Sequence, residues 1–326
     1  MCTFLFFQNF FFLLTKMFFS APGIQIDEPF TLLSLLTLFN FLGHPILAFK
    51  FLQKFQIFPE NPKCRKAKCK GKIMNPQMRG NSICFRCTKC KRRVRAKTNK
   101  MCKFFKMAVD KFLLLIFFWA NKESRSTAAS YLGLPIKTVS RFFIKIESIC
   151  SSKMRDSFLE LKFGGKLRIC EVDEAKMRKP KYNRGASLFK SRKWIFGIWD
   201  RSTHAGYCVP VPNRNYPTLA HIIRKYVLKG SVIYSDEWKA YRGLSKIGYI
   251  HRTVNHSKTF KNRVTNVHTN GIESFWSRLK AMYRAKKGVR DRDLGQFCNL
   301  FLWREKFGHT ANDAFWHVLY HLGERH

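Results

Sequence analysis

Three acidic residues stand at places where a predicted strand ends or a predicted helix begins. Asp173 ends the run ICEVD, Asp236 ends VIYSD, and Glu273 lies near the start of TNGIESFWSRLK. Acids are scarce in this chain, with 20 Asp and Glu against 61 Lys and Arg, so their positions are informative. Hard divalent cations need carboxylate oxygens that converge from rigid elements. We therefore predict that these three acids hold Mg²⁺ or Mn²⁺ and support phosphoryl transfer.

The helix expected around Glu273 carries this acid and several bases on one face. Asn270, Glu273, Lys280 and Arg284 recur at the spacing that places residues above one another on a helix. We predict that Lys280 and Arg284 bind DNA phosphates next to the metal. His268 and Asn270 are predicted to assist catalysis by orienting DNA or a metal-bound water, although a capping or loop role fits them equally.

Neighbouring residues are predicted to have lesser roles. Glu174 and Glu237 each follow one of the aspartates, and successive side chains of a strand point to opposite faces, so both rank lower as ligands. Four tryptophans are predicted to belong to the core rather than to stack on bases: Trp194, Trp199, Trp238 and Trp276.

A series of short β-rich runs must position these acids. The runs cover residues 167–173, 193–200, 205–211, 231–236 and 248–254. A helical pattern from Thr218 to Leu228 separates the third run from the fourth, and further helices are expected at 270–286, 291–305 and 310–322. Strands interrupted by a crossover helix indicate a mixed α/β sheet.

A cysteine cluster forms a second candidate site. Four residues separate Cys64 from Cys69, two separate Cys87 from Cys90, and seventeen lie between the pairs. This spacing is typical of a zinc ribbon, in which four thiolates bind structural Zn²⁺ and replace a hydrophobic core. Cys84 could substitute for Cys64 or Cys87, and unligated thiols in a basic linker are the alternative. The many surrounding Lys and Arg residues would let the ribbon lie on a phosphate backbone.

Residues 121–147 contain a candidate helix-turn-helix. A first helix is followed by a turn at Gly133 and by a second helix from about Pro135, a residue suited to a first helical turn. An ordinary helical hairpin is the alternative. The side chains near the start of the second helix, where base edges would be reached, are Lys137, Thr138, Ser140 and Arg141.

The charge balance favours a nucleic-acid partner. The 326 residues carry a formal net charge of +41, and such a chain usually neutralises phosphate, with membrane-surface binding as the main competitor. Residues 1–20 are strongly apolar, but Gln8, Asn9 and Lys16 interrupt the run, and we expect no stable membrane partner.

Several blocks of the sequence resemble one known family in order and approximate spacing. The blocks VDEAKM, SRKWIFGIWDRS, GSVIYSDEWKAYRGL, HRTVNHSKTF and VHTNGIESFWSRLK are similar to those of the ISXO-type insertion-sequence transposases and their eukaryotic relatives, the Merlin superfamily of DNA transposons. The resemblance covers about residues 165–310. It implies an RNase H-like fold and a DDE catalytic triad that falls on Asp173, Asp236 and Glu273.

The resemblance, together with the two preceding motifs, predicts a domain order. We expect an apolar extension at 1–26, a helical segment at 27–62, a zinc ribbon at 63–98, a helix-turn-helix unit at 101–150 and an RNase H-like catalytic domain at 165–326.

The expected function is that of a DNA transposase. It would bind terminal inverted repeats, cleave DNA strands and transfer them to target DNA, and two ends must be joined together, which implies a homo-oligomer. The protein would act on chromosomes, in the nucleus of a eukaryote or in the cytoplasm and nucleoid of a bacterium. An inactive, domesticated DNA-binding protein is the alternative.

Overall fold

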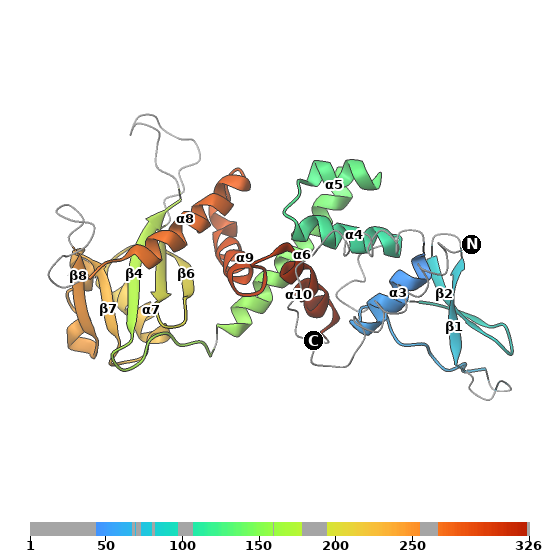
Figure 1. Cartoon of the computed structure of the whole chain (residues 1–326), viewed down its shortest axis with the longest axis horizontal. Coiled ribbons are helices and arrows are strands. Elements are labelled where there is room, and N and C mark those ends of the chain that lie inside the picture. The colour runs from blue at the N-terminus through green and yellow to red at the C-terminus, as the bar shows by residue number, and fades with distance from the viewer. Residues whose placement is uncertain are drawn as a thin grey trace, which may run out of the picture.

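The computed structural model of the protein places two β-sheets at opposite ends of an elongated molecule, with a group of helices between them (Figure 1). It describes residues 44–66, 69, 73–79, 82–96, 107–158, 160–177, 194–254 and 267–324. The predicted extension at 1–26 and residues 27–43 of the predicted helical segment at 27–62 lie outside these residues. Within them, no helix is long and apolar enough to cross a membrane.

The larger sheet has five strands in the order β6-β5-β4-β7-β8. The strands are β4 (Ile169–Lys176), β5 (Trp194–Asp200), β6 (Ala205–Val211), β7 (Val232–Asp236) and β8 (Ile250–Val254). The pairs β4–β5 and β5–β6 are antiparallel, whereas β4–β7 and β7–β8 are parallel. The predicted mixed α/β class is thus confirmed, and the carboxyl ends of β4 and β7 meet at one edge of the sheet.

Helix α8 (Asn270–Ala285) packs against one face of this sheet through two glycines. A Cβ added at Gly197 would lie 2.5 Å from the Trp276 ring, and one at Gly206 would lie 2.5 Å from the Phe275 ring. Because neither strand residue has a side chain, the two aromatic rings of α8 can lie directly on the backbone of β5 and β6. This close approach sets the position of α8 above the sheet.

The opposite face is covered by α7 (Tyr216–Tyr226) and by the short 3-10 helices η3 (Lys239–Tyr241) and η4 (Leu244–Ile247). Tyr226 of α7 packs on Tyr207 of β6, with ring centroids 4.2 Å apart. Tyr241 of η3 is fully buried and reaches Glu174 of β4. The sheet is therefore covered on both faces, as a largely apolar sheet requires.

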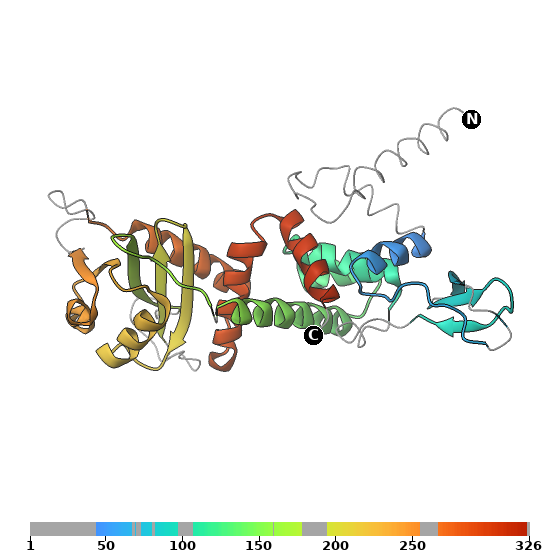
Figure 2. The same ribbon diagram turned by 90° about the horizontal axis from the view of Figure 1, so that it is seen from below.

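The central group of helices joins the two ends of the molecule. It contains α4 (Val109–Ala120), α5 (Arg125–Leu132), α6 (Ile136–Ser157), α9 (Leu294–Phe307) and α10 (Ala311–Gly323). The long helix α6 starts beside α5 and continues toward the five-stranded sheet, where it packs against α9 (Figure 2). The last helix, α10, packs against α4 and α6 as well as α9.

Two polar contacts reinforce this junction. Arg304 of α9 is stacked on Trp119 at 3.9 Å and donates hydrogen bonds to the carbonyls of Trp119 and Ala120, which end α4. Lys286, directly after α8, pairs with Glu147 of α6 at 2.6 Å. The end of α8 is therefore linked to α6, the second helix of the predicted helix-turn-helix.

The smaller sheet consists of β1 (Met74–Arg79), β2 (Ser82–Cys87) and β3 (Arg93–Arg95), all antiparallel. Helix α3 (Pro45–Lys54) packs beside it. Phe49 of α3 contacts Phe85 of β2 and Phe58, with ring centroids 5.7 and 4.7 Å apart. The apolar core of this unit is small, so a further source of stability is needed.

Candidate active site

Three carboxylates line one cavity at the edge of the five-stranded sheet where β4 and β7 end. The cavity measures about 190 Å³ and is lined by Val172, Asp173, Asp236, Thr269 and Glu273. All three acids singled out in the sequence therefore lie at one place. Asp173 and Asp236 are half-buried and Glu273 is exposed, so an incoming substrate can reach them.

The parallel pairing of β4 and β7 explains why the two aspartates meet. Glu171 of β4 is opposite Tyr234 of β7 in the register. Two residues further along each strand come Asp173 and Asp236, which therefore stand at the same level and on the same face. Sequence separation does not matter here, because the strand direction brings both carboxyl ends to one edge.

Hydrogen bonds hold each carboxylate in place. The Trp276 indole of α8 donates to Asp173 Oδ2 at 2.9 Å. The backbone N–H of Trp238 donates to Asp236 Oδ1 at 3.0 Å, closing a tight turn after β7. The Thr269 hydroxyl lies 3.4 Å from Glu273 Oε1. Trp276 is 3% exposed, so it serves the core and orients a pocket acid at the same time.

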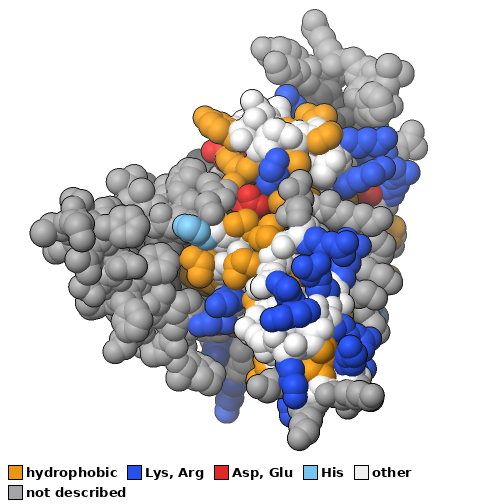
Figure 3. Space-filling view, turned by 90° about the vertical axis from the view of Figure 1, so that its right-hand side faces the viewer, with side chains coloured by type: hydrophobic (Ala, Val, Ile, Leu, Met, Phe, Trp, Pro, Cys, Tyr) orange, Lys and Arg blue, Asp and Glu red, His pale blue; other side chains and the backbone are white. Residues whose placement is uncertain are grey.

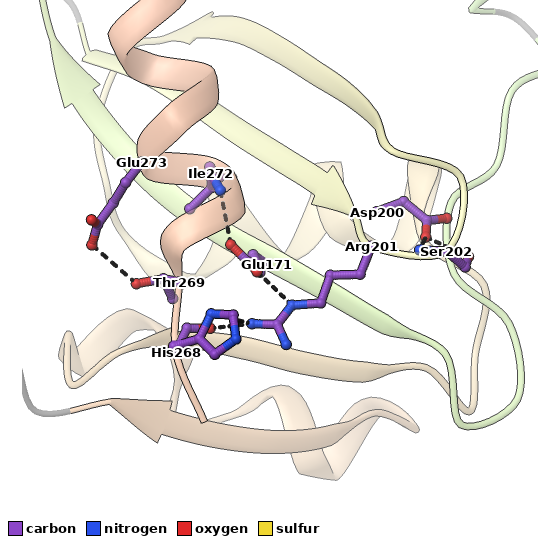
Figure 4. A network of polar contacts seen from close by, with 8 residues as sticks. All are labelled: Glu171, Asp200, Arg201, Ser202, His268, Thr269, Ile272 and Glu273. Carbon is purple, nitrogen blue, oxygen red and sulfur yellow. Dashed lines mark hydrogen bonds and ion pairs between the residues drawn. The ribbon is translucent and has the colours of Figure 1, made fainter. Parts of the chain in front are cut away.

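A buried charged network fixes the start of α8 on the sheet (Figure 4). Glu171, whose side chain is 1% exposed, accepts a hydrogen bond from the Ile272 backbone N–H at 2.8 Å. Its other oxygen accepts from Arg201 Nε at 2.5 Å, and Arg201 Nη2 contacts His268 Nδ1 at 2.8 Å and the His268 carbonyl at 2.6 Å. A buried anion at a helix N-terminus also complements the helix dipole.

Gly271 leaves room for this network. A Cβ at that position would lie 2.4 Å from the Trp199 ring and 3.1 Å from Glu171 Oε1. The first turn of α8 can therefore press against β4 and β5. Sequence analysis missed Glu171 and Arg201 as contributors to the site, and the available signal was an acid at Glu171 between the apolar Cys170 and Val172.

The network leads to a prediction about positioning. Replacing Glu171 with Gln removes the buried anion that pairs with Arg201 and anchors Ile272. We expect the DNA cleavage predicted from the sequence to fall by about 10- to 100-fold, the usual cost of losing a group that orients metal ligands, and the metal concentration required to rise. Cleavage rates measured over a series of Mg²⁺ concentrations would show both effects.

The matched control is Glu305→Gln, which removes the charge from the ion pair between Glu305 and Arg278 on the exposed side of α8. Both partners are partly exposed, and such pairs contribute about 0–1 kcal/mol, so this variant should have the same rate as the native protein in this assay. Thermal melting of both variants would separate loss of fold from loss of positioning. A Glu171→Gln protein with native metal dependence would exclude the positioning role.

Two other buried acids lie on the same sheet without lining the cavity. Glu174 faces away from Asp173, its side chain is 2% exposed, and Tyr241 donates a hydrogen bond to it. Burial, with the charges of Asp173 and Asp236 adding to it, raises the pKa of Glu174 to about 7. Asp200, the last residue of β5, accepts hydrogen bonds from the Gly164 backbone N–H and from Ser202, and it pairs with Cys170 near the start of β4, away from the cavity.

The remaining predicted residues of this region lie around the cavity rather than in its wall. His268 is half-buried and held by Arg201, and Asn270 is the first residue of α8 and exposed. Lys280 is half-buried and Arg284 is exposed, both further along α8. A direct catalytic role for His268 and Asn270 remains a prediction.

The four tryptophans behave differently from one another. Trp276 is buried, and Trp194 and Trp199 are half-buried against the core, as predicted. The prediction is wrong for Trp238, which is 40% exposed. Its position directly after β7, in a loop at the sheet edge, leaves one side of the indole without a covering element.

At the opposite end of the molecule, four cysteines converge. The sulfur atoms of Cys64, Cys69, Cys87 and Cys90 all lie within 4.8 Å of one another. Cys64 and Cys90 are 3.5 Å apart, and Cys69 and Cys87 are 3.3 Å apart, so the thiols are free rather than disulfide-bonded. The backbone N–H of Cys90 lowers the pKa of the Cys87 thiol to about 6. This donor set fits a tetrahedral zinc ion.

The position of Cys84 distinguishes it from these four. It lies on β2 three residues before Cys87, and residues separated by an odd number along a strand point to opposite faces. Cys84 is buried, but it is not part of the cysteine group. The alternative ligand assignments through Cys84 therefore have no support from the geometry.

The surface around the cysteines is basic (Figure 3). No Asp or Glu occurs between Asn61 and Val109. The exposed basic residues described here are Lys63, Arg65, Lys66, Arg79, Lys89, Lys91, Arg92, Arg93 and Arg95. We define this set as the ribbon basic surface.

Helices α5 and α6, with the turn at Gly133 between them, occupy the segment predicted to be a helix-turn-helix. Ser124 caps α5 by accepting from the Thr127 N–H at 3.0 Å, and Gly133 ends it in the left-handed conformation with φ of 58°. Pro135 directly precedes α6, and the buried Ala128 and Val139 lie in the core. Of the predicted DNA contacts at the start of α6, Lys137 and Arg141 are exposed, whereas Thr138 and Ser140 are half-buried.

Comparison with known proteins gives three results. A model of the ISXO2-like transposase domain matches residues 163–306. An uncharacterized transposase-like protein of Haemophilus influenzae is 31% identical over 98 residues, which cover 30% of this chain and 78% of that protein. The crystal structure of the catalytic core domain of BIV integrase aligns with 46% of this chain and 93% of that domain, at 12% identity and a TM-score of 0.29.

The matched domain begins just before β4 and ends within α9, so it contains the three acids of the cavity and the network that positions α8. The relative of similar sequence is matched over more than three quarters of its length. The chain therefore belongs to the family of ISXO2-like transposases, whose domain is of the DDE type.

Proposed function

We propose that this protein is a DNA transposase that binds the terminal inverted repeats of its element, cleaves DNA strands there and joins the 3′ ends to target DNA. The observation that carries the proposal is the convergence of Asp173, Asp236 and Glu273 on one accessible cavity within the matched domain. The RNase H-like fold and the relation to the Merlin superfamily belong to the same proposal, supported by the mixed five-stranded sheet.

The three carboxylates of the cavity would hold Mg²⁺ or Mn²⁺, because oxygen donors from rigid elements suit hard cations. When bound, such ions activate a water or a 3′-hydroxyl and stabilise the leaving oxygen in phosphodiester chemistry. Trp276 orients Asp173 through its indole N–H. Lys280 and Arg284 would neutralise phosphates of the strand that lies along α8.

Two further parts of the chain would recognise the DNA ends. A structural zinc ion on Cys64, Cys69, Cys87 and Cys90 would stabilise the ribbon, and the ribbon basic surface would contact phosphates. Lys137, Thr138, Ser140 and Arg141 at the start of α6 would reach base edges in a major groove. Since two DNA ends must be processed together, we propose that the active form is a homo-oligomer.

Strand cleavage on the DNA that flanks the gene tests this function. The purified full chain should nick duplexes carrying the flanking inverted repeats in Mg²⁺ or Mn²⁺, and EDTA should stop the reaction. Sequencing gels would locate the cleaved bond at the repeat boundary. Binding to the repeats without cleavage in either metal would instead support the inactive DNA-binding protein.

A further inference from the structure

An exposed tryptophan stands next to the carboxylate cavity. Trp238 is 40% exposed, in contrast with Trp276 of α8, which hydrogen-bonds Asp173 and is 3% exposed. Trp238 follows Asp236 by two residues, and its backbone N–H donates to the Asp236 carboxylate. Its indole is therefore joined to a cavity acid by a short, hydrogen-bonded turn.

Several contacts hold the Trp238 ring in one orientation. Its indole N–H donates to the Arg214 carbonyl at 3.1 Å. The Arg214 guanidinium lies 4.4 Å from the centre of the Trp238 ring and 3.7 Å from that of Trp194. Arg214 is in turn placed by Glu174, 3.8 Å away, which is buried. We call Trp194, Arg214 and Trp238 the tryptophan–arginine cluster.

The cluster lies at the same end of the sheet as the cavity but on the face opposite Asp173, since Glu174 and Lys176 are separated from Asp173 by an odd number of residues along β4. Trp194, at the start of β5, pairs with Lys176 at the end of β4, three residues beyond Asp173. Lys176 places its ammonium group 4.5 Å from the Trp194 ring. Trp238 is the member of the cluster joined to the cavity, through its hydrogen bond to Asp236, so the nucleotide next to a phosphate at the carboxylates would have to extend over the end of β7 to meet the cluster.

A rigid aromatic ring beside a phosphodiester-cleaving pocket suits one ligand in particular. Aromatic side chains with neighbouring cations bind unpaired bases by stacking, and this stacking tolerates any base sequence. A base inside a duplex offers no free face, so it must leave the helix to be bound in this way. If Trp238 only covered part of the core, its exposed ring would not need the hydrogen bonds that fix its orientation.

We propose that Trp238 stacks on an unpaired base of the nucleotide next to the scissile phosphate, and that the tryptophan–arginine cluster is the subsite for this base. The inference rests on the proposed function and adds a requirement to it: the duplex opens at the cleavage site. Trp238 would act as a positioning residue for the scissile strand, while the carboxylates perform the chemistry.

The test compares Trp238→Ala, Trp238→Phe and native protein on two kinds of duplex from the flanking repeats. One kind is fully paired. The other carries a single mismatch, placed in turn at each of the two nucleotides that flank the cleaved bond. On the paired duplex, Trp238→Ala should cleave about 5- to 150-fold more slowly, the range for loss of one base–aromatic stack. A mismatch at the stacked position should restore most of the rate, and Trp238→Phe should stay close to native.

Tyr320→Ala is the matched control, because Tyr320 is exposed to a similar extent, 43%, but lies on α10 away from the cavity. It should cleave both duplexes at the native rate. Native activity of Trp238→Ala on the paired duplex, or an equal deficit on paired and mismatched duplexes, would overturn the proposal.

A second measurement separates this proposal from the proposed function. Fluorescence anisotropy with a short single-stranded oligonucleotide reports base stacking without cleavage. If the native protein cleaves no duplex, the transposase function fails, yet a weaker affinity of Trp238→Ala than of Trp238→Phe would still support the base subsite. Equal affinities of the two variants would overturn it.

Discussion

Asp236→Asn should abolish strand cleavage while leaving the protein folded and able to bind DNA. The substitution keeps the shape of the side chain and the acceptor for the Trp238 N–H, but removes one of the three charges that would bind the metal. Loss of a single stabilising hydrogen-bond donor already costs about 100- to 1,000-fold in rate, so we expect a decrease of at least about 1,000-fold. Asp173→Asn and Glu273→Gln should behave alike, and quantified gel assays on the flanking repeats would measure all three.

Glu237→Gln is the control for this experiment. Glu237 is the next residue along the chain and is exposed, and it is not among the residues that line the cavity. The variant changes the net charge by the same amount and should cleave at close to the native rate. Equal activity of Asp236→Asn and the native protein would remove the catalytic assignment. A deficit shared with Glu237→Gln would assign the effect to overall charge instead.

The sequence was sufficient to locate the three acids because each stands at a boundary that local patterns reveal. Asp236 ends a short β-branched and aromatic run, and Glu273 opens an amphipathic helix, so local propensity alone placed both. The α/β class followed from the alternation of these runs. The cysteine pairs were equally local, and only the choice between Cys84 and its neighbours needed the register of β2.

The supporting contacts could not be predicted in the same way. Arg201 meets Glu171 across 30 residues of sequence, and Glu171 meets Ile272 across 101. Such pairs depend on how α8 lies over the sheet, which in turn depends on the glycines that admit its aromatic rings. Trp238 was misjudged for a related reason: aromatic residues are mostly buried, and its exposure follows from the loop it occupies.

Loss of the cysteine site should have the second large effect. Cys87→Ser removes one of four sulfur atoms that lie within 4.8 Å of one another. A ribbon with so small a core depends on its metal, because structural zinc contributes about 10–16 kcal/mol of binding energy in zinc-finger peptides. We expect bound zinc to fall from one ion per chain to almost none, and the ribbon to unfold. Metal analysis and proteolysis of residues 63–96 would detect both changes.

Unfolding of the ribbon in Cys87→Ser should also weaken DNA binding, and the salt dependence of the affinity would show whether phosphate contacts of the ribbon were lost. If the ribbon basic surface makes three or more phosphate contacts, the slope of log affinity against log salt should become less steep by about 2.7 or more, at about 0.9 per contact. Cys84→Ser is the matched control, since this buried cysteine lies on the same strand outside the metal group, and it should keep both zinc and the native slope. Zinc loss with an unchanged slope would mean that the ribbon does not touch the DNA. In that case the start of α6 and the basic face of α8 would have to supply the phosphate contacts that the charge of the chain demands.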